Sequence, residues 1–290
     1  MVLTVRPRIL GGFLPTLWRP MLSIGALNIP SYYIDVTPFV GLLVDGKRHQ
    51  IGLQVTNANS FWFVDANLHL WVDRDSNQTV GGLTSYKITP NATITAKGHV
   101  ADNLDANFTT TAHRTVSVSG WVRTSMCKVQ SDVNRVIKFQ NVQKYTNGSN
   151  VESWTQNLVQ SATTITTSIP LRPSSSSRAT IHVHTETDDW PFSGWSSYTP
   201  LADNGFLIDA HIDQGRVRRV EDSRNVRVEV TRRRQIGEGS FGTTGKGVRI
   251  GGPTELETTL KLRGIAGCYE RKVVVNQTRV LSDKVDQKCQ

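Results

Sequence analysis

The stretch FWFVDANLHLWVD, residues 61–73, combines carboxylates, an amide and an imidazole with large aromatic side chains. Its residues alternate between apolar and polar, and alternate side chains of a strand point to opposite faces. The polar face of such a strand would present Asp65, Asn67, His69, Trp71 and Asp73. Carboxylates and imidazoles perform acid and base catalysis, and aromatic rings beside polar groups suit a sugar. The stretch therefore predicts a strand with a chemically active face, and a second layer packed onto that face is the alternative.

Two other segments have the same character. IHVHTETD, residues 181–188, would place two histidines and two carboxylates on one face, and FLIDAHID, residues 206–213, would oppose Asp209, His211 and Asp213 to an apolar face. His-x-His is a metal-ligand spacing, but an exposed polar face is the favoured interpretation because nothing fixes a third ligand. If the three strands were neighbours, they would share a carboxylate- and imidazole-lined floor. Polar faces in water are the alternative.

Alternation with a period of two dominates the rest of the chain. The segments that show it most clearly are residues 51–55, 92–96, 115–122, 136–145, 161–168, 180–184, 206–213, 225–230 and 258–265. They are rich in Val, Ile, Thr and aromatic residues, and turn signals such as Asn147-Gly148 and Asn204-Gly205 separate them. The sequence therefore predicts an all-β protein of antiparallel sandwich or jelly-roll type.

Composition excludes several classes of protein. The chain has 290 residues, 38% hydrophobic and 20% charged, and no apolar run approaches the length of a membrane span. The start of the chain is broken by Gly11, Gly12 and Pro15 and does not predict a signal peptide. The net charge of +9 comes partly from arginines in residues 216–220 and 230–234. No aromatic residues interleave with them for base stacking, so no nucleic-acid partner is expected.

Cysteines and glycosylation signals bear on the compartment. Three cysteines are too few to hold the whole fold; Cys268 and Cys289 could close one loop, and Cys127 is interpreted as a small buried residue. Five Asn-x-Ser/Thr signals begin at Asn77, Asn91, Asn107, Asn147 and Asn276. This number weakly favours a secreted protein.

A set of short motifs runs from residue 11 to the C-terminus. They are Gly11-Gly12, Leu17-Trp18-Arg19-Pro20, Asp35-Val36-Thr37-Pro38-Phe39, Leu43-Val44-Asp45-Gly46, His49, Val55-Thr56, Leu68-His69-Leu70-Trp71-Val72-Asp73, Ser119-Gly120-Trp121-Val122, Cys268-Tyr269, Val280-Leu281-Ser282-Asp283 and Cys289. Together they resemble the peptide N-glycosidase A family, the peptide-N-(N-acetylglucosaminyl)asparagine amidases of plants and fungi. The resemblance is specific over residues 11–73 and looser beyond.

The resemblance implies hydrolysis of the amide that joins an N-glycan to asparagine in glycopeptides or glycoproteins, with no metal and no cofactor. It implies that residues 1–10 lie outside the family pattern. Residues 11–90 would form the C-terminal part of a first β-sandwich domain, and residues 91–290 would form a second β-sandwich domain. The chain thus resembles the C-terminal part of a secreted family member, truncated at its N-terminus, and would pair with the preceding half.

Amide hydrolysis needs a carboxyl group that positions water and a polar group that stabilises the oxyanion. The strand pattern, rather than a transferred motif, assigns Asp65 as the first candidate acid and base, with His69 or Asp73 orienting it. The residues expected to bind substrate are Trp62, Asn67, Trp71, Asp209 and His211. A non-catalytic glycan-binding β-sandwich is the alternative function.

Overall fold

The computed structural model describes Ile24 and residues 31–53, 65–172, 178–224, 227–277 and 279–288. These residues form a short 3-10 helix η2 (Thr37–Phe39), a single-turn helix α1 (Val40–Leu43) and twelve strands. The strands are β1 (Val80–Ile88), β2 (Thr93–Val100), β3 (Ala106–Arg123), β4 (Cys127–Thr146), β5 (Val151–Pro170), β6 (Thr180–Pro200), β7 (Phe206–Asp222), β8 (Arg227–Thr243), β9 (Arg249–Ile250), β10 (Pro253–Gly264), β11 (Gly267–Asn276) and β12 (Arg279–Asp286). No described helix combines the length and apolarity that crossing a membrane requires.

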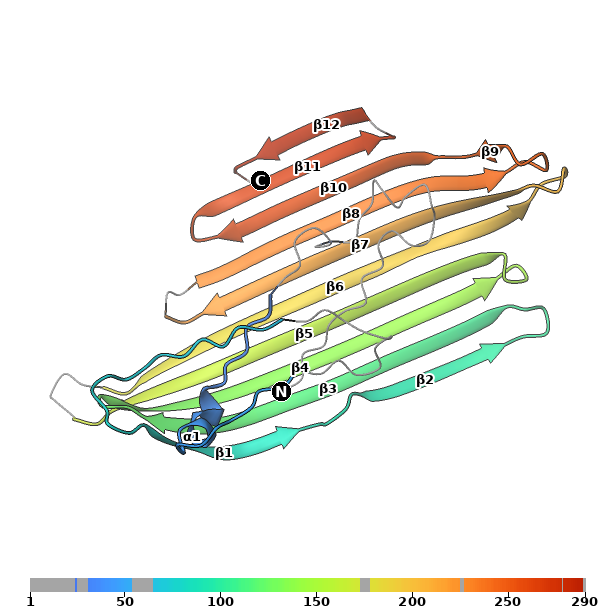
Figure 1. Ribbon diagram of the computed structural model, residues 1–290. Helices are drawn as coiled ribbons and strands as arrows, with labels where there is room; N and C mark the ends of the chain where they lie inside the picture. Colours follow the sequence, from blue (N-terminus) through green and yellow to red (C-terminus); the bar gives the residue numbers. More distant parts are fainter. Residues whose placement is uncertain are drawn as a thin grey trace.

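All twelve strands belong to one antiparallel sheet (Figure 1). Its order is β1-β3-β4-β5-β6-β7-β8-β10-β11-β12, with β2 also paired with β3 and β9 with β8. Most neighbouring strands are therefore consecutive in the chain and form hairpins. The expected all-β, antiparallel class is confirmed. The described strands make one open sheet, and a second, facing sheet is not among them. β1 and β2, on either side of residue 90, both pair with β3, and the division into two domains at this residue stays a prediction.

The turn signals separate strands as expected. Asn147-Gly148 lies between β4 and β5 with positive φ at both residues, the left-handed backbone that Asn and Gly adopt at least cost. Asn204-Gly205 lies between β6 and β7, with positive φ at Asn204. These turns fix the register of the hairpins and therefore decide which side chains share a face.

The sheet has two chemically different faces. On the face called here the inner face, cross-strand neighbours such as Val118 and Val133 are buried together. Two apolar clusters occupy this face: Ile24, Ile137, Leu158 and Trp190 with Phe139, and Ala210, Ile212 and Leu256 with Phe192, Ile208, Phe241 and Val275. The opposite, outer face is rich in Ser, Thr, Asn, Gln and charged residues, such as the pair Thr163 and Thr185.

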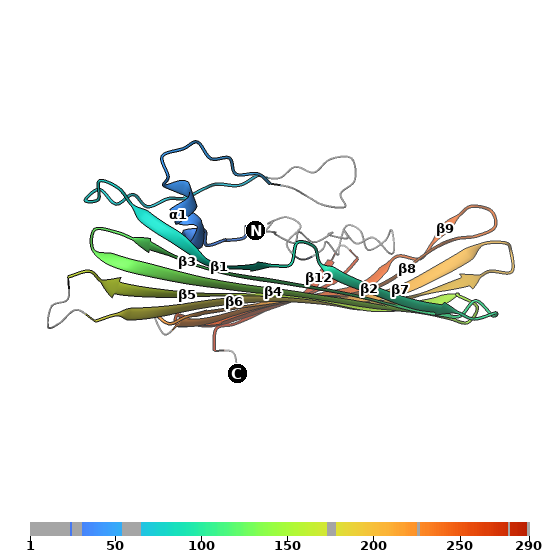
Figure 2. The ribbon, with the colours of Figure 1, turned by 90° about the horizontal axis from the view of Figure 1, so that it is seen from below.

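Residues 31–53 and 65–79 lie on the inner side of the sheet (Figure 2). Close packing onto β3 requires a glycine at position 120. A Cβ atom added to Gly120 would lie 2.2 Å from the carbonyl oxygen of Pro38, which is itself fully buried. Two motifs that are distant in sequence, Asp35–Phe39 and Ser119–Val122, therefore touch each other directly.

Replacing Gly120 with alanine should force this contact apart and lower the free energy of unfolding by about 1–3 kcal/mol. The added methyl group would meet backbone atoms of Pro38, which cannot rotate away as a side chain could. Chemical denaturation of both proteins measures the loss. Gly52→Ala is the matched control, because a Cβ atom there meets nothing within 4 Å. Equal stability of the Gly120 and Gly52 variants would contradict the packing.

The strand predicted for residues 61–73 is wrong where it can be checked. Residues 65–73 have no strand partner, and residues 61–64 lie outside the described residues. Alternation alone does not make a strand, because backbone groups also need a neighbouring edge to pair with, and β1 already pairs with β3 at this side of the sheet. Residues 51–53, also expected in a strand, are not in one either.

Candidate functional site

A band of ionisable side chains crosses the inner face of β4, β6 and β7. We call it the charged band, and it consists of Arg135, His182, His184, Glu186, Asp188, Arg216, Arg218 and Asp222. Registers of the strands place these residues on one face, because directly paired residues of antiparallel strands share a face. His182, His184, Glu186 and Asp188 therefore do share one face, as the sequence predicted. The interpretation of that face as exposed is wrong, since these side chains are half-buried or buried.

Asp188 and Arg216 form the most deeply buried ion pair of the charged band. Arg216 Nε donates to Asp188 Oδ1 at 2.6 Å, and only 6% of the aspartate side chain is exposed. The guanidinium carbon of Arg216 also lies 4.5 Å from the ring centroid of Trp190. The cation has a carboxylate on one side and an aromatic face on another, and these contacts offset part of the cost of burying the pair.

Arg135 connects the charged band to the overlying segment 31–38. Arg135 Nη2 donates to the Tyr33 carbonyl oxygen at 3.2 Å. Burial lowers the pKa of Arg135, while the negative charge of Glu186 opposes that shift. Glu186 also pairs with Arg218 at 2.8 Å.

Asp35 adds a carboxylate from the same overlying segment. Its Oδ2 accepts from the Ser131 hydroxyl at 2.5 Å, and its Oδ1 accepts from the Thr37 backbone N–H at 2.9 Å. Ser131 is fully buried on the inner face of β4. Asp35 therefore holds the motif Asp35–Phe39 against the sheet next to the charged band.

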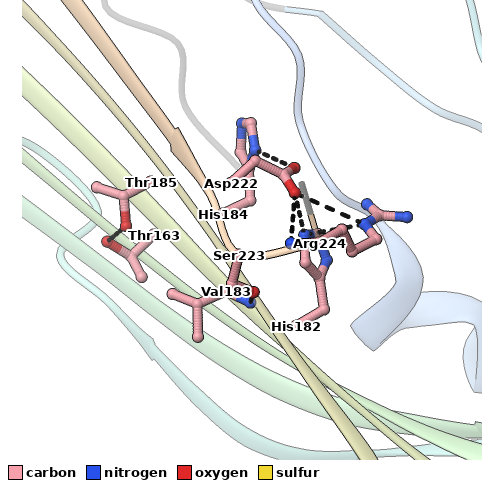
Figure 3. Close-up of polar contacts among 8 residues, drawn as sticks. All are labelled: Thr163, His182, Val183, His184, Thr185, Asp222, Ser223 and Arg224. Carbon is pink, nitrogen blue, oxygen red and sulfur yellow. Dashed lines mark hydrogen bonds and ion pairs between the residues drawn. The ribbon is translucent and has the colours of Figure 1, made fainter. Parts of the chain in front are cut away.

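Asp222 lies between two histidines at the end of β7 (Figure 3). His182 Nε2 is 2.9 Å from Asp222 Oδ1, and His184 Nδ1 is 3.1 Å from Asp222 Oδ2. Burial alone would raise the pKa of Asp222. The hydrogen bonds from His182, His184 and the Arg224 backbone N–H outweigh burial and lower this pKa to about 2.

His182 Nε2 faces two competing partners. Arg224 Nε donates to His182 Nε2 at 2.9 Å, and Asp222 Oδ1 lies at the same distance from this nitrogen. A neutral imidazole nitrogen without a proton can accept from Arg224, whereas a protonated one can donate to Asp222. The tautomer of His182 therefore decides which of the two partners this nitrogen bonds. Within the described part of the chain, no group of His, Cys, Asp and Glu side chains is arranged to hold a metal ion.

Replacing Asp222 with asparagine should remove a stabilisation of roughly 1–2 kcal/mol at neutral pH. The low pKa in the folded state means that ionised Asp222 stabilises the protein fully above its unfolded pKa of about 4. This contribution is lost as the pH falls towards 2, where the folded protein also protonates the carboxylate. Denaturation midpoints of both proteins between pH 7 and pH 2 measure the difference. A stability difference that stayed constant down to pH 2 would contradict the assignment.

Residues 65–73, which carry the predicted catalytic groups, form an exposed segment tied to the sheet at one end. Asp65 and His69 are exposed, and Trp71 is 92% exposed. Asp73 accepts from the Ser125 backbone N–H at 2.6 Å and from the Ser125 hydroxyl at 2.8 Å. The backbone hydrogen bond, then the hydroxyl one, lowers the pKa of Asp73. Asp73 is therefore an anchor, whereas Asp65 and His69 are accessible.

The prediction that three strands share a carboxylate- and imidazole-lined floor is wrong. Asp209 and His211 lie on the outer face of β7, because their neighbours Ala210 and Ile212 are buried on the inner face, as the alternation predicted. The histidines of β6 face the opposite way, and residues 65–73 are outside the sheet. His211 instead meets Glu238 of β8, with His211 Nδ1 2.9 Å from Glu238 Oε1.

Other predicted residues have mixed outcomes. Trp62 and Cys289 lie outside the described residues, and Asn67 is exposed in the segment 65–73. Cys268 is disulfide-bonded and Cys127 is a free, half-buried thiol, so the pairing of Cys268 with Cys289 stays a prediction. The asparagines of the five glycosylation signals are all exposed: Asn77, Asn91, Asn107, Asn147 and Asn276.

Sequence reasoning missed most of the charged band. Arg135 and Asp222 carry no local motif, and the arginines of residues 216–220 looked like a solvated strand face. The usable signal was the alternation itself: Arg216 and Arg218 have the same parity as the buried Ala210 and Ile212 of their strand. A cation on the apolar face of a strand needs a buried partner.

Comparison with known proteins bears on the segments that cover the inner face. Residues 8–89 match the family described as peptide N-acetyl-beta-D-glucosaminyl asparaginase amidase A. The chain is also 28% identical over 279 residues to peptide-N4-(N-acetyl-beta-glucosaminyl)asparagine amidase A of Prunus dulcis. The resemblance to the peptide N-glycosidase A family is confirmed. The aligned region covers 96% of this chain and 47% of the almond protein, so the chain spans about half the length of that relative.

The match to peptide N-glycosidase A includes both segments that lie on the inner side of the sheet, residues 31–53 and 65–79. Alignment with the almond protein extends the similarity over nearly the whole chain, including the long strands. No solved structure matches this chain.

Proposed function

We propose that this chain contributes the catalytic site of a peptide N-glycosidase, which hydrolyses the amide between an N-glycan and asparagine. The observation that carries the proposal is the alignment of 279 residues with an asparagine amidase. The exposure of Asp65, His69 and Trp71 on one segment supports it. A glycopeptide is large, so groups that act on it must be open to solvent.

In the proposed reaction, Asp65 accepts a proton from water as the water oxygen attacks the asparagine side-chain carbonyl. A tetrahedral oxyanion forms, and its collapse breaks the carbon–nitrogen bond. The nitrogen takes up a proton and leaves as the glycosylamine, and the asparagine becomes aspartate. His69 lies four residues from Asp65 on the same exposed segment and orients it.

The remaining proposed roles concern binding and position. Trp71 offers its ring to the apolar side of a sugar, with Trp62 and Asn67 nearby in sequence. Asp73 acts as a positioning residue, because its carboxylate is already engaged by Ser125. The charged band holds the overlying segment 31–38 in place through Arg135 and is not assigned a chemical step.

Exposure of all five glycosylation-signal asparagines supports a further part of the proposal, that the protein is made in the secretory pathway. A folded chain can carry glycans only at accessible asparagines. Expression through a eukaryotic secretory pathway should yield mass additions at these positions. A product without any glycan mass would contradict this part.

The function is tested by incubating the purified chain with a short N-glycopeptide and measuring the deglycosylated peptide by mass spectrometry. Appearance of the peptide with aspartate in place of asparagine supports a complete site within this chain. Retention of the glycopeptide without any product would instead favour the glycan-binding alternative.

A further inference from the structure

Trp195 is an isolated aromatic platform on the hydrophilic outer face of the sheet. The residue is 41% exposed and lies in the second half of β6. The residues before and after it on the same face are Ser193 and Ser197, and its partner on β5 is Ser153. Serine side chains are too short to cover an indole ring, so the ring remains accessible from solvent.

Trp121 provides a contrast on the same face. Lys128 places its Nζ atom 4.7 Å from the Trp121 ring centroid, and the ring is only half-exposed. Trp121 therefore has a cation as its partner within the chain, whereas Trp195 has serines before and after it on its own strand and opposite it on β5. Single exposed apolar residues are common on protein surfaces, so the polar groups next to Trp195 decide whether it forms a site.

A row of polar groups begins beside Trp195 and crosses two strands. The direct partner of Trp195 on β7 is His211, and the partner of His211 on β8 is Glu238. His211 and Glu238 are hydrogen-bonded, and Glu238 remains exposed. Asp209, next along β7, lies between Ser197 of β6 and Ser240 of β8.

We propose that Trp195, His211, Glu238 and Asp209 form a glycan-binding site on the outer face, separate from the segment 65–73. An exposed ring binds the apolar side of a pyranose, and carboxylate, imidazole and hydroxyl groups at its edge bind sugar hydroxyls. The choice of an N-glycan as the occupant rests on the proposed function. The site would hold the glycan of a glycoprotein while residues on the other side of the sheet act.

The test is fluorine NMR of the chain labelled with 5-fluorotryptophan and titrated with a free oligomannose N-glycan. The seven tryptophans give separate signals, and Trp195 and Trp121 are assigned by their phenylalanine variants. The Trp195 signal should shift with added glycan and the Trp121 signal should not. Trp195→Ala should weaken binding at this site by about tenfold, and Glu238→Gln should also weaken it.

A Trp195 signal that stays unchanged at millimolar glycan would overturn the proposal, whether or not the Trp71 signal moves. Equal affinity of the wild-type chain and Trp195→Ala would also overturn it. Binding is measured without turnover, so the result is independent of the proposed amidase activity.

Discussion

Replacing Asp188 with asparagine should lower the free energy of unfolding by about 3–5 kcal/mol, the largest stability effect expected in this protein. The substitution keeps the shape of the side chain and removes its charge. Arg216 would then remain charged on the inner face, with 11% of its side chain exposed and no carboxylate at 2.6 Å. Contact with Trp190 offsets only part of that cost.

Denaturant unfolding of three variants separates the ion pair from general damage to the core. Asp188→Asn and Arg216→Met should each destabilise strongly, and the double variant should be more stable than the sum of both losses predicts. Glu221→Gln is the matched control, because its pair with Arg219 is exposed on the outer face of the same strand. We expect Glu221→Gln to change the free energy of unfolding by close to zero. Additive losses in the double variant would show that the pair is not coupled.

Replacing Asp65 with asparagine should reduce turnover of a glycopeptide by about 10²–10⁴-fold in the active protein. The amide cannot accept the proton of the attacking water, although its size and hydrogen-bonding reach are similar. The fold should be unaffected, because Asp65 is exposed and its carboxylate accepts a local hydrogen bond from the neighbouring Ala66 N–H. Measurement of kcat and KM, together with the thermal midpoint, distinguishes chemistry from folding.

Asp102→Asn is the control for this experiment, since Asp102 is an exposed aspartate in the turn between β2 and β3. It should leave kcat and KM at their wild-type values. His69→Gln should lower kcat less than Asp65→Asn, because an orienting group acts through the carboxylate rather than on the substrate. Turnover of Asp65→Asn within a few-fold of wild type would remove this residue from the mechanism.

Much of the sheet follows from local sequence. Alternation in residues 206–213 correctly placed Ala210 and Ile212 on a buried face and Asp209 and His211 on the other. Val, Ile and Thr in these segments favour extended backbone, and Asn147-Gly148 supplies the turn that pairs β4 with β5. Periodicity does not determine how many strands join one sheet, because pairing between strands depends on contacts distant in sequence.

Prediction of the site was weaker for the same reason. The row from His182 to Asp188 has the pattern of a polar surface, and only the arginines and Asp222 of β7 show that it is a paired, half-buried band. The segment from Asp65 to Asp73 has the pattern of a strand, yet no described strand edge receives it. The partners that decide the environment of the row from His182 to Asp188 lie more than 20 residues away along the chain.

Hydrolysis of a short N-glycopeptide in water enriched in oxygen-18 tests the central claim most directly. Attack of water on the asparagine amide must leave one heavy oxygen in the aspartate of the peptide product. Mass spectrometry of the peptide produced by the wild-type chain should show this labelled aspartate. The peptide incubated with the Asp65→Asn variant should contain almost none. A properly folded chain that leaves the glycopeptide intact, or that cuts between the sugars and leaves the asparagine unlabelled, would contradict the account.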